Sequence, residues 1–297
     1  MSLITQLKQI SDPRHLRGRR HELWVILFLS LLGFLCGYPG YRPLASFCRN
    51  HEPSLRLLLA LPDDQPLPSY STFRRHFLQT SPYELIAGFN HWAMATLPAF
   101  SPALLPIDGK SIRATSTGGN GENQNFVSLV SLYSEQLGVL QIRMMENKKA
   151  SEIHVAQALL AQLPALPPGQ CFSFDALHTQ TATAIAVNET GQDYLMALKK
   201  NQLASYTEVE TLSQTQVPIS QVKEQDDSHG RQVHRTVELF EPTPALRLKF
   251  PNLASVARVQ RLGLRLQKQF SETVYYLTSV LFKRWELKPT LASLQAF

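Results

Sequence analysis

Ala103-Leu-Leu-Pro-Ile-Asp108 and Cys171-Phe-Ser-Phe-Asp175 are two short apolar runs, and each ends in an aspartate. Runs of this length are typical of buried strands, where an unpaired carboxylate would be costly. Either aspartate alone could begin a turn or cap a helix. The two together, with a hairpin between them, predict one site that holds a divalent metal ion.

The residues around these two runs alternate between strand and helix patterns. Strands are predicted over residues 104–108, 126–134, 139–145, 171–174 and 194–198. Helices are predicted after Ser151, which is a suitable N-cap, and over residues 178–189. Three antiparallel strands followed by alternating helices and strands predict a mixed five-stranded sheet with flanking helices. This α/β arrangement is that of the RNase H-like fold.

Residues 1–97 have a different character, and we predict an all-helical N-terminal domain followed by an α/β domain over residues 98–297. Helices are predicted at 3–10, 21–36, 41–50, 53–61, after Ser69, and at 82–96. The apolar run from Leu23 to Cys36 is shorter than the roughly 20 residues that span a bilayer. We therefore expect a core helix there and no contact with a membrane.

The charge of the chain is compatible with a nucleic-acid partner. The net charge is +6, and residues 1–21 hold five lysines and arginines against one acid, Asp12. Arg74 and Arg75 lie in the run Thr72–Phe77, which could be a DNA recognition helix or an ordinary amphipathic helix with a solvated face. The three cysteines lack metal-ligand spacing, and we interpret them as reduced thiols in a cytoplasmic protein.

Seven segments, in this order and spacing, resemble one family. They are Ser11-Asp-Pro-Arg, Asp108-Gly-Lys-Ser-Ile-Arg113, Lys148-Lys-Ala-Ser-Glu152-Ile, Asp175-Ala-Leu-His-Thr-Gln180, Asp193-Tyr-Leu-Met-Ala-Leu-Lys-Lys-Asn-Gln202, His229-Gly-Arg231 and Tyr275-Tyr-Leu-Thr-Ser279. The ordered set resembles the DDE transposases of the ISAs, or H-repeat-associated, insertion sequences over residues 1 to 280.

The resemblance implies a metal-dependent transposase that cleaves DNA strands and transfers them at element ends. Asp108 and Asp175 would be the first two catalytic carboxylates, and they would share two Mg²⁺ (or Mn²⁺) ions with a third acid on a late helix. The implied partners are double-stranded DNA, both as terminal inverted repeats and as target DNA, and further copies of the chain in a homo-oligomer. We expect such a protein in the cytoplasm, associated with the nucleoid.

Several basic and polar residues are expected to contact DNA. Lys110 would share a strand face with Asp108 if the strand continued, where it could approach a phosphate or face solvent. The complete set of predicted DNA-binding residues is Arg74, Arg75, Lys110, Arg113, Lys199, Lys200 and Asn201.

Three further positions have alternative interpretations. His178, three residues after Asp175, could form a hydrogen bond near the site or cap the turn. We expect Glu152 to cap its helix rather than to bind metal. His229-Gly-Arg231 is interpreted as a turn that leads into a strand over Val233–Leu239.

The chain departs from the family pattern after Tyr275-Tyr-Leu-Thr-Ser279. The family has a later helix with an Arg, His-Trp, Ile-Glu-Asn pattern that supplies the third acid, and no Ile-Glu-Asn occurs here. Glu286 is a possible third acid, although Pro289 would disturb a long helix there. We therefore expect a shortened or frameshifted copy, incomplete at its C-terminus, with little activity and an uncovered sheet face.

Two other functions fit parts of the sequence. A non-catalytic remnant could bind element ends and compete with an intact transposase; DNA binding without cleavage would indicate this. A different RNase H-like nuclease would show no preference for inverted repeats.

Overall fold

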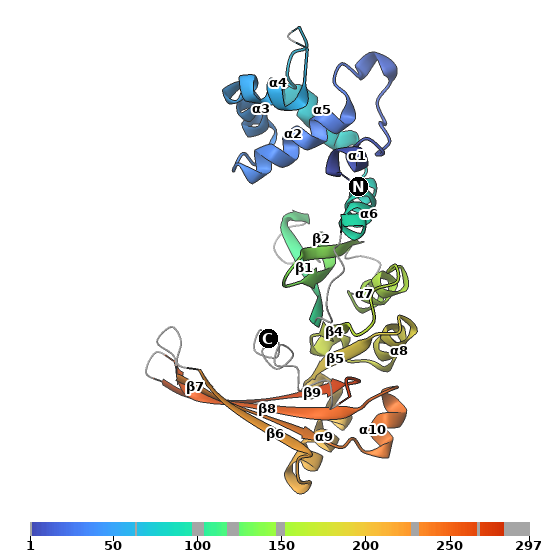
Figure 1. Cartoon of the computed structure of the whole chain (residues 1–297), viewed down its shortest axis with the longest axis vertical. Coiled ribbons are helices and arrows are strands. Elements are labelled where there is room, and N and C mark those ends of the chain that lie inside the picture. The colour runs from blue at the N-terminus through green and yellow to red at the C-terminus, as the bar shows by residue number, and fades with distance from the viewer. Residues whose placement is uncertain are drawn as a thin grey trace. The chain divides into compact units, whose positions relative to one another are not determined.

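The computed structural model describes residues 2–62, 64–96, 104–117, 125–146, 152–226, 232–265 and 268–281. The chain divides into two units, residues 1–97 and 98–297, coloured blue to cyan and green to red in Figure 1. Over these residues, no helix is both long and apolar enough to cross a membrane.

The first unit is helical, as the sequence predicts. Its helices are α1 (Leu3–Leu7), α2 (Leu23–Leu35), α3 (Tyr41–Asn50), α4 (Glu52–Leu59), α5 (Tyr70–Gln79) and α6 (Pro82–Thr96), with a 3-10 turn η1 (Leu16–Gly18). The bounds of α3 and α6 agree with the prediction, whereas α1 is shorter. It ends early because the amides of Gln9 and Ile10 bond three residues back, to Gln6 and Leu7, and tighten the chain into a turn.

The apolar run in α2 forms the centre of this unit. Buried side chains of α2, α3, α4 and α5 make one core cluster: Val25, Ile26, Leu29, Leu44, Phe47, Cys48, Leu55 and Phe73. Gly33 lets α2 approach α3 closely, because a Cβ atom at this position would lie 2.4 Å from Cδ2 of Leu44. The core-helix interpretation of Leu23–Cys36 is therefore confirmed.

The second unit contains a mixed sheet of nine strands, so the prediction of five strands was wrong. The strands are β1 (Leu104–Thr117), β2 (Asn125–Ser134), β3 (Gly138–Glu146), β4 (Cys171–Phe174), β5 (Asp193–Leu198), β6 (Ser220–Asp226), β7 (Gln232–Phe240), β8 (Ser255–Arg265) and β9 (Lys268–Thr278). Their order in the sheet is β3-β2-β1-β4-β5-β9-β8-β7-β6. The five predicted strands are all present and adjacent, and an antiparallel four-stranded extension follows β5.

Strand β9 joins the extension to β5 by backbone pairing, and polar side chains reinforce this junction. Leu195 pairs with Thr278 in antiparallel register. The Thr278 hydroxyl donates to the Tyr194 carbonyl at 2.8 Å, and the Tyr194 amide donates to the Ser279 hydroxyl at 2.9 Å. The prediction recognised residues 233–239 as a strand and Tyr275–Ser279 as a motif but placed neither in the sheet.

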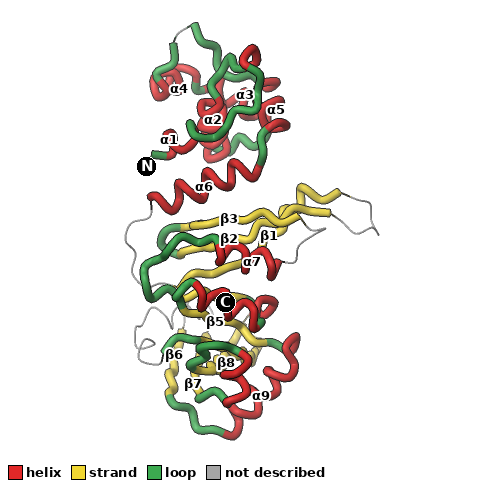
Figure 2. The backbone as a smooth tube through the Cα atoms, turned by 90° about the vertical axis from the view of Figure 1, so that its right-hand side faces the viewer, coloured by secondary structure: helices red, strands yellow, loops and turns green. Residues whose placement is uncertain are grey.

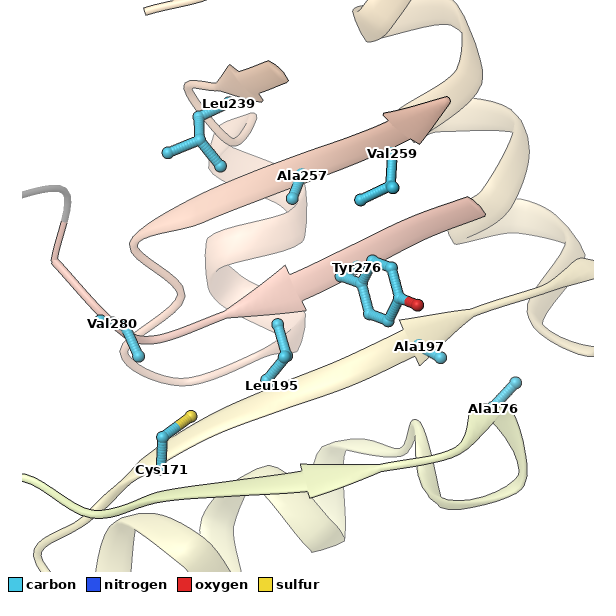
Figure 3. Close-up of a cluster of buried hydrophobic side chains, with 9 residues drawn as sticks. All are labelled: Cys171, Ala176, Leu195, Ala197, Leu239, Ala257, Val259, Tyr276 and Val280. Carbon is cyan, nitrogen blue, oxygen red and sulfur yellow. The ribbon is translucent and has the colours of Figure 1, made fainter. Parts of the chain in front are cut away.

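Apolar side chains reinforce the junction between β5 and the extension. Figure 3 shows one buried cluster with side chains from β4, β5, β7, β8 and β9 and from the segments that follow β4 and β9: Cys171, Ala176, Leu195, Ala197, Leu239, Ala257, Val259, Tyr276 and Val280. Full burial of an aliphatic side chain contributes roughly 1.5–3 kcal/mol. The buried cluster therefore continues from β4 and β5 into the extension, across the β5–β9 junction.

Helices and 3-10 turns connect the strands. They are α7 (Glu152–Ala161), η2 (Ala176–His178), α8 (Thr181–Glu189), η3 (Lys200–Gln202), α9 (Leu203–Thr215) and α10 (Pro244–Lys249). Helix α7 packs against β3 and α8, in front of the strands in Figure 2. The single helix predicted over 178–189 is wrong, because Gln180 is extended and separates η2 from α8.

One buried histidine makes the first unit sensitive to pH. His76 lies on α5 with no exposed surface, and its Nε2 atom is 2.9 Å from the Thr80 hydroxyl. Burial, followed by the charge of Arg14, lowers the pKa of His76 to about 4 from an ordinary value near 6.5. The unfolded chain therefore binds a proton more readily than the folded chain between these two values.

We expect the stability of the chain to fall as the pH is lowered from about 6.5 to about 4, by roughly 3 kcal/mol at most from this group. Replacing His76 with Gln should flatten the pH dependence of the unfolding temperature in that window, as measured by circular dichroism. The exposed His15→Gln variant is the control and should keep the wild-type slope. An unchanged slope in His76→Gln would show that this histidine is not the responsible group.

Candidate functional site

The register of two parallel strands places Asp108 and Asp175 at the same level of the sheet. Four residue pairs join β1 to β4, and the last is Ile107 with Phe174. Asp108 follows Ile107, and Asp175 follows Phe174 directly after the end of β4. Both side chains are exposed. The prediction that the two aspartates lie at the same end of neighbouring strands fits this register.

The prediction that β1 ends at Asp108 was wrong, because this strand continues to Thr117. From Ile107 onward β1 pairs with β2, with Asp108 opposite Ser131. Strand β4 ends at Phe174, so β1 loses its partner on that side at Asp108. The carboxylate is therefore exposed inside a long strand, at the place where the sheet opens.

Each aspartate uses one carboxylate oxygen to shape its own backbone. Oδ1 of Asp175 accepts a hydrogen bond from the Leu177 amide at 2.9 Å and begins η2, as the turn-cap interpretation expects. Oδ1 of Asp108 accepts from the Gly109 amide at 2.9 Å. Among the described residues, no lysine or arginine forms an ion pair with either aspartate. Both side chains thus offer exposed, hard oxygen atoms.

A third carboxylate lies beside the first aspartate. Oε1 of Glu152, at the start of α7, is 3.1 Å from Nε2 of His178. A Cβ atom at position 109 would lie 2.3 Å from Cδ of Glu152, so only glycine leaves room for this carboxylate. Glu152 therefore joins α7 to β1 and to the turn after β4. We expected it to cap its helix, but its side chain bonds to His178, and Ser151 lies outside the described residues.

His178 is the buried member of this group. Its side chain is 1% exposed, and its ring lies 5.8 Å from the ring of Phe174 between centroids. Nδ1 is buried and has no hydrogen-bond partner. Of the two sequence interpretations, the one with a hydrogen bond close to the aspartates agrees with the contact to Glu152.

The turn that carries Asp175 is fixed from the end of β5. The side-chain amide of Asn201 donates to the Ala176 carbonyl at 2.7 Å. The Thr179 hydroxyl donates to the Ala197 carbonyl. Asn201 was predicted to contact DNA, and in the structure its amide instead holds the segment that follows Asp175.

The predicted basic residues occupy different places. Lys110 is exposed two residues after Asp108, and because β1 continues, the two share a strand face. Lys199 is exposed at the end of β5, and the ammonium of Lys200 lies 5.9 Å from the ring of Tyr206. Arg113 belongs to β1, but its side chain is outside the described residues.

The remaining candidates lie elsewhere. Arg74 and Arg75 are exposed on α5 in the first unit. Glu286 and His229-Gly-Arg231 fall outside the described residues. In the described part of the chain, no three or more His, Cys, Asp or Glu side chains are arranged as a ready metal-binding group. The sequence could have indicated Glu152, because it lies in one of the motifs that support the family resemblance.

Two family models match the chain. The model described as DDE_Tnp_1-associated matches residues 4–93. The model described as Transposase DDE domain matches residues 100–289 and therefore includes Asp108, Glu152, Asp175 and His178.

Curated proteins show the same relationship. "Uncharacterized protein in dhlA 3'region" of Xanthobacter autotrophicus is 30% identical over 258 residues, which are 84% of this chain and 85% of that protein. "Putative transposase YncI" of Escherichia coli O157:H7 is 26% identical over 202 residues, 68% of this chain and 50% of the relative, so the chain spans half its length.

A third relative carries the name that the sequence motifs suggested. "H repeat-associated putative transposase YbfD" of Escherichia coli K12 is 24% identical over 200 residues, 67% of this chain and 77% of the relative. The match to the DDE domain model covers more than half of the chain and agrees with the ordered motifs. The chain therefore belongs to the family of DDE transposases.

Proposed function

We propose that this chain is an insertion-sequence transposase whose second unit cleaves DNA strands and transfers them at element ends. The observation that carries the proposal is the position of Asp108 and Asp175. Both are exposed, and each directly follows the last residue pair that joins the parallel strands β1 and β4. The strand order β3-β2-β1-β4-β5 supports an RNase H-like domain over residues 98–297, with the four further strands as an addition to it.

The donor atoms of the two aspartates suit Mg²⁺ or Mn²⁺. These cations prefer carboxylate oxygens and retain several water molecules, which exposed side chains permit. Asp108 and Asp175 would hold the metal ions with the oxygen atoms that their backbone hydrogen bonds leave available. When bound, such ions supply the charge that stabilises the developing negative charge on phosphoryl oxygens. Glu286 remains our candidate for a third acid.

We assign Glu152 a positioning role within this site. Its carboxylate lies against the backbone of Gly109, next to Asp108, and close to His178, three residues after Asp175. One side chain therefore fixes the spacing between the two segments that carry the aspartates. Partners of this kind typically change metal affinity or activity by 10–100-fold when they are removed.

The partner of the second unit would be double-stranded DNA. Lys110 shares a face with Asp108, and Lys199 and Lys200 follow the strand next to Asp175, so these lysines and Arg113 could contact backbone phosphates. A reaction that joins two element ends would bring at least two copies of the chain together.

Asp108→Asn and Asp175→Asn should each abolish Mg²⁺-dependent nicking of a plasmid that carries the element. Both should also weaken Mn²⁺ binding measured by electron paramagnetic resonance, because each removes one anionic ligand. Glu135→Gln, an exposed acid between β2 and β3, is the control and should bind Mn²⁺ as the wild type does. Wild-type Mn²⁺ affinity in both asparagine variants would refute the assignment. DNA binding without nicking by the wild type would indicate a protein that binds but does not cleave.

Gly109→Ala should weaken Mn²⁺ binding about tenfold, because the new methyl group displaces the Glu152 carboxylate. Glu152→Ala should have a similar effect, and the double variant should be no weaker than either single one, since both remove the same contact. Gly18→Ala, where nothing lies within 4 Å of the added methyl group, is the control. A fall in unfolding temperature without a change in Mn²⁺ affinity would reduce Glu152 to a purely structural role.

A further inference from the structure

The first unit contains a cleft between the segment that precedes α2 and the beginning of α5. Its volume is about 510 Å³. Three arginines, Arg14, Arg20 and Arg75, lie along it, together with the hydroxyl residues Ser69, Ser71 and Thr72. Among the described residues that line the cleft, none is an aspartate or a glutamate. The composition therefore favours an anionic ligand.

The arginines of the cleft differ in their availability. Arg14 is nearly buried and forms an ion pair with Asp12 at 2.7 Å, so it has a structural partner. Arg20 and Arg75 are exposed and form no ion pair with a carboxylate in the described residues. The only bond found for the Arg75 guanidinium is from Nε to the Ser71 carbonyl at 3.2 Å. Two arginine side chains are therefore available to a ligand.

The beginning of α5 adds neutral donors to the same cleft. Ser69 occupies the N-cap position, but its hydroxyl makes no capping bond to a backbone amide and instead lies 3.0 Å from the Ser71 hydroxyl. The first amides of a helix lack partners within it, and the helix dipole favours negative charge at this end. The cleft thus combines hydroxyl groups and the positive end of a helix dipole with two arginines.

A buried polar atom in the cleft wall also lacks a partner. His21 lines the cleft and is only 5% exposed, and its Nδ1 atom has no hydrogen bond. Such atoms are usually paired in folded proteins, with a ligand or water where no protein group is available. Burial, followed by the charges of Arg20 and Arg14, lowers the pKa of His21, which agrees with a positive potential in the cleft.

We propose that this cleft binds a phosphodiester group of the backbone of double-stranded DNA, an inference that rests on the proposed function. No Phe, Tyr or Trp lines the cleft, so it offers no surface on which an unpaired base could stack. Its donors suit phosphate oxygens, and phosphate contacts position a protein on a duplex without reading its sequence. The first unit thereby supplies affinity and register to the catalytic unit.

The test measures binding of a labelled random-sequence duplex to the full chain by fluorescence anisotropy over a range of KCl concentrations. Arg20→Gln and Arg75→Gln should each weaken binding about tenfold at fixed salt. Each should also lower the slope of log K against log salt concentration by about 1, because one fewer counterion is released. The double variant should lower the slope by about 2.

Arg17→Gln and Arg49→Gln are matched controls, because both residues are exposed, neither lines the cleft, and each substitution removes one charge. Circular dichroism verifies that all variants are folded. Wild-type affinity and slope in both cleft variants would overturn the cleft assignment while leaving the proposed function intact. Equal losses in the controls would overturn it in favour of a diffuse charge effect. No duplex binding by the wild type would refute the proposed function itself.

Discussion

The parallel pairing of β1 with β4 determines where the acidic site lies. Only four residue pairs connect these strands, and the pairing ends immediately before Asp108 and Asp175. A shift of one residue in either strand would turn an aspartate toward the opposite sheet face, because side chains alternate along a strand. Burial fixes this register in both strands, because Leu105 and Ile107 on β1 and Phe172 and Phe174 on β4 are almost completely buried. The apolar cores therefore set the spacing of the two carboxylates.

A second set of contacts ties the loops to this register. Glu152 reaches across Gly109 to His178, and Asn201 holds the Ala176 carbonyl, so α7, the turn after β4 and the end of β5 are mutually fixed. These contacts explain why polar residues recur in the motifs after each strand. In the structure, Glu152 and Asn201 brace the segments that carry the aspartates, whereas Lys110 and Lys199 are exposed.

Local sequence patterns were sufficient for much of the fold. The apolar runs before the two aspartates, the turn at Gly138 and the helical spacing of residues 1–97 are short-range signals, and the corresponding elements form. The extension of the sheet was missed because β5 and β9, although paired in the sheet, lie far apart in the sequence. The Thr278 and Ser279 hydroxyls that bond to Tyr194 give no alternating pattern from which this pairing could be predicted. The role of Glu152 was missed for a related reason. A glutamate at a helix start resembles a cap, and only the close approach of its carboxylate to Gly109 in the structure shows where the side chain lies.

The charge distribution gives the two units complementary roles under the proposed function. Asp108 and Asp175 would bring negative charge to the place where a phosphodiester reacts, and this charge would repel DNA until cations are bound. The affinity that holds DNA there must come from positive charge elsewhere on the chain. Exposed lysines on β1 and after β5 would supply part of it, and the cleft of the first unit would add Arg20 and Arg75. Under the proposed function, such a chain would hold DNA without metal yet cleave it only with metal, because binding and chemistry would depend on different charged groups.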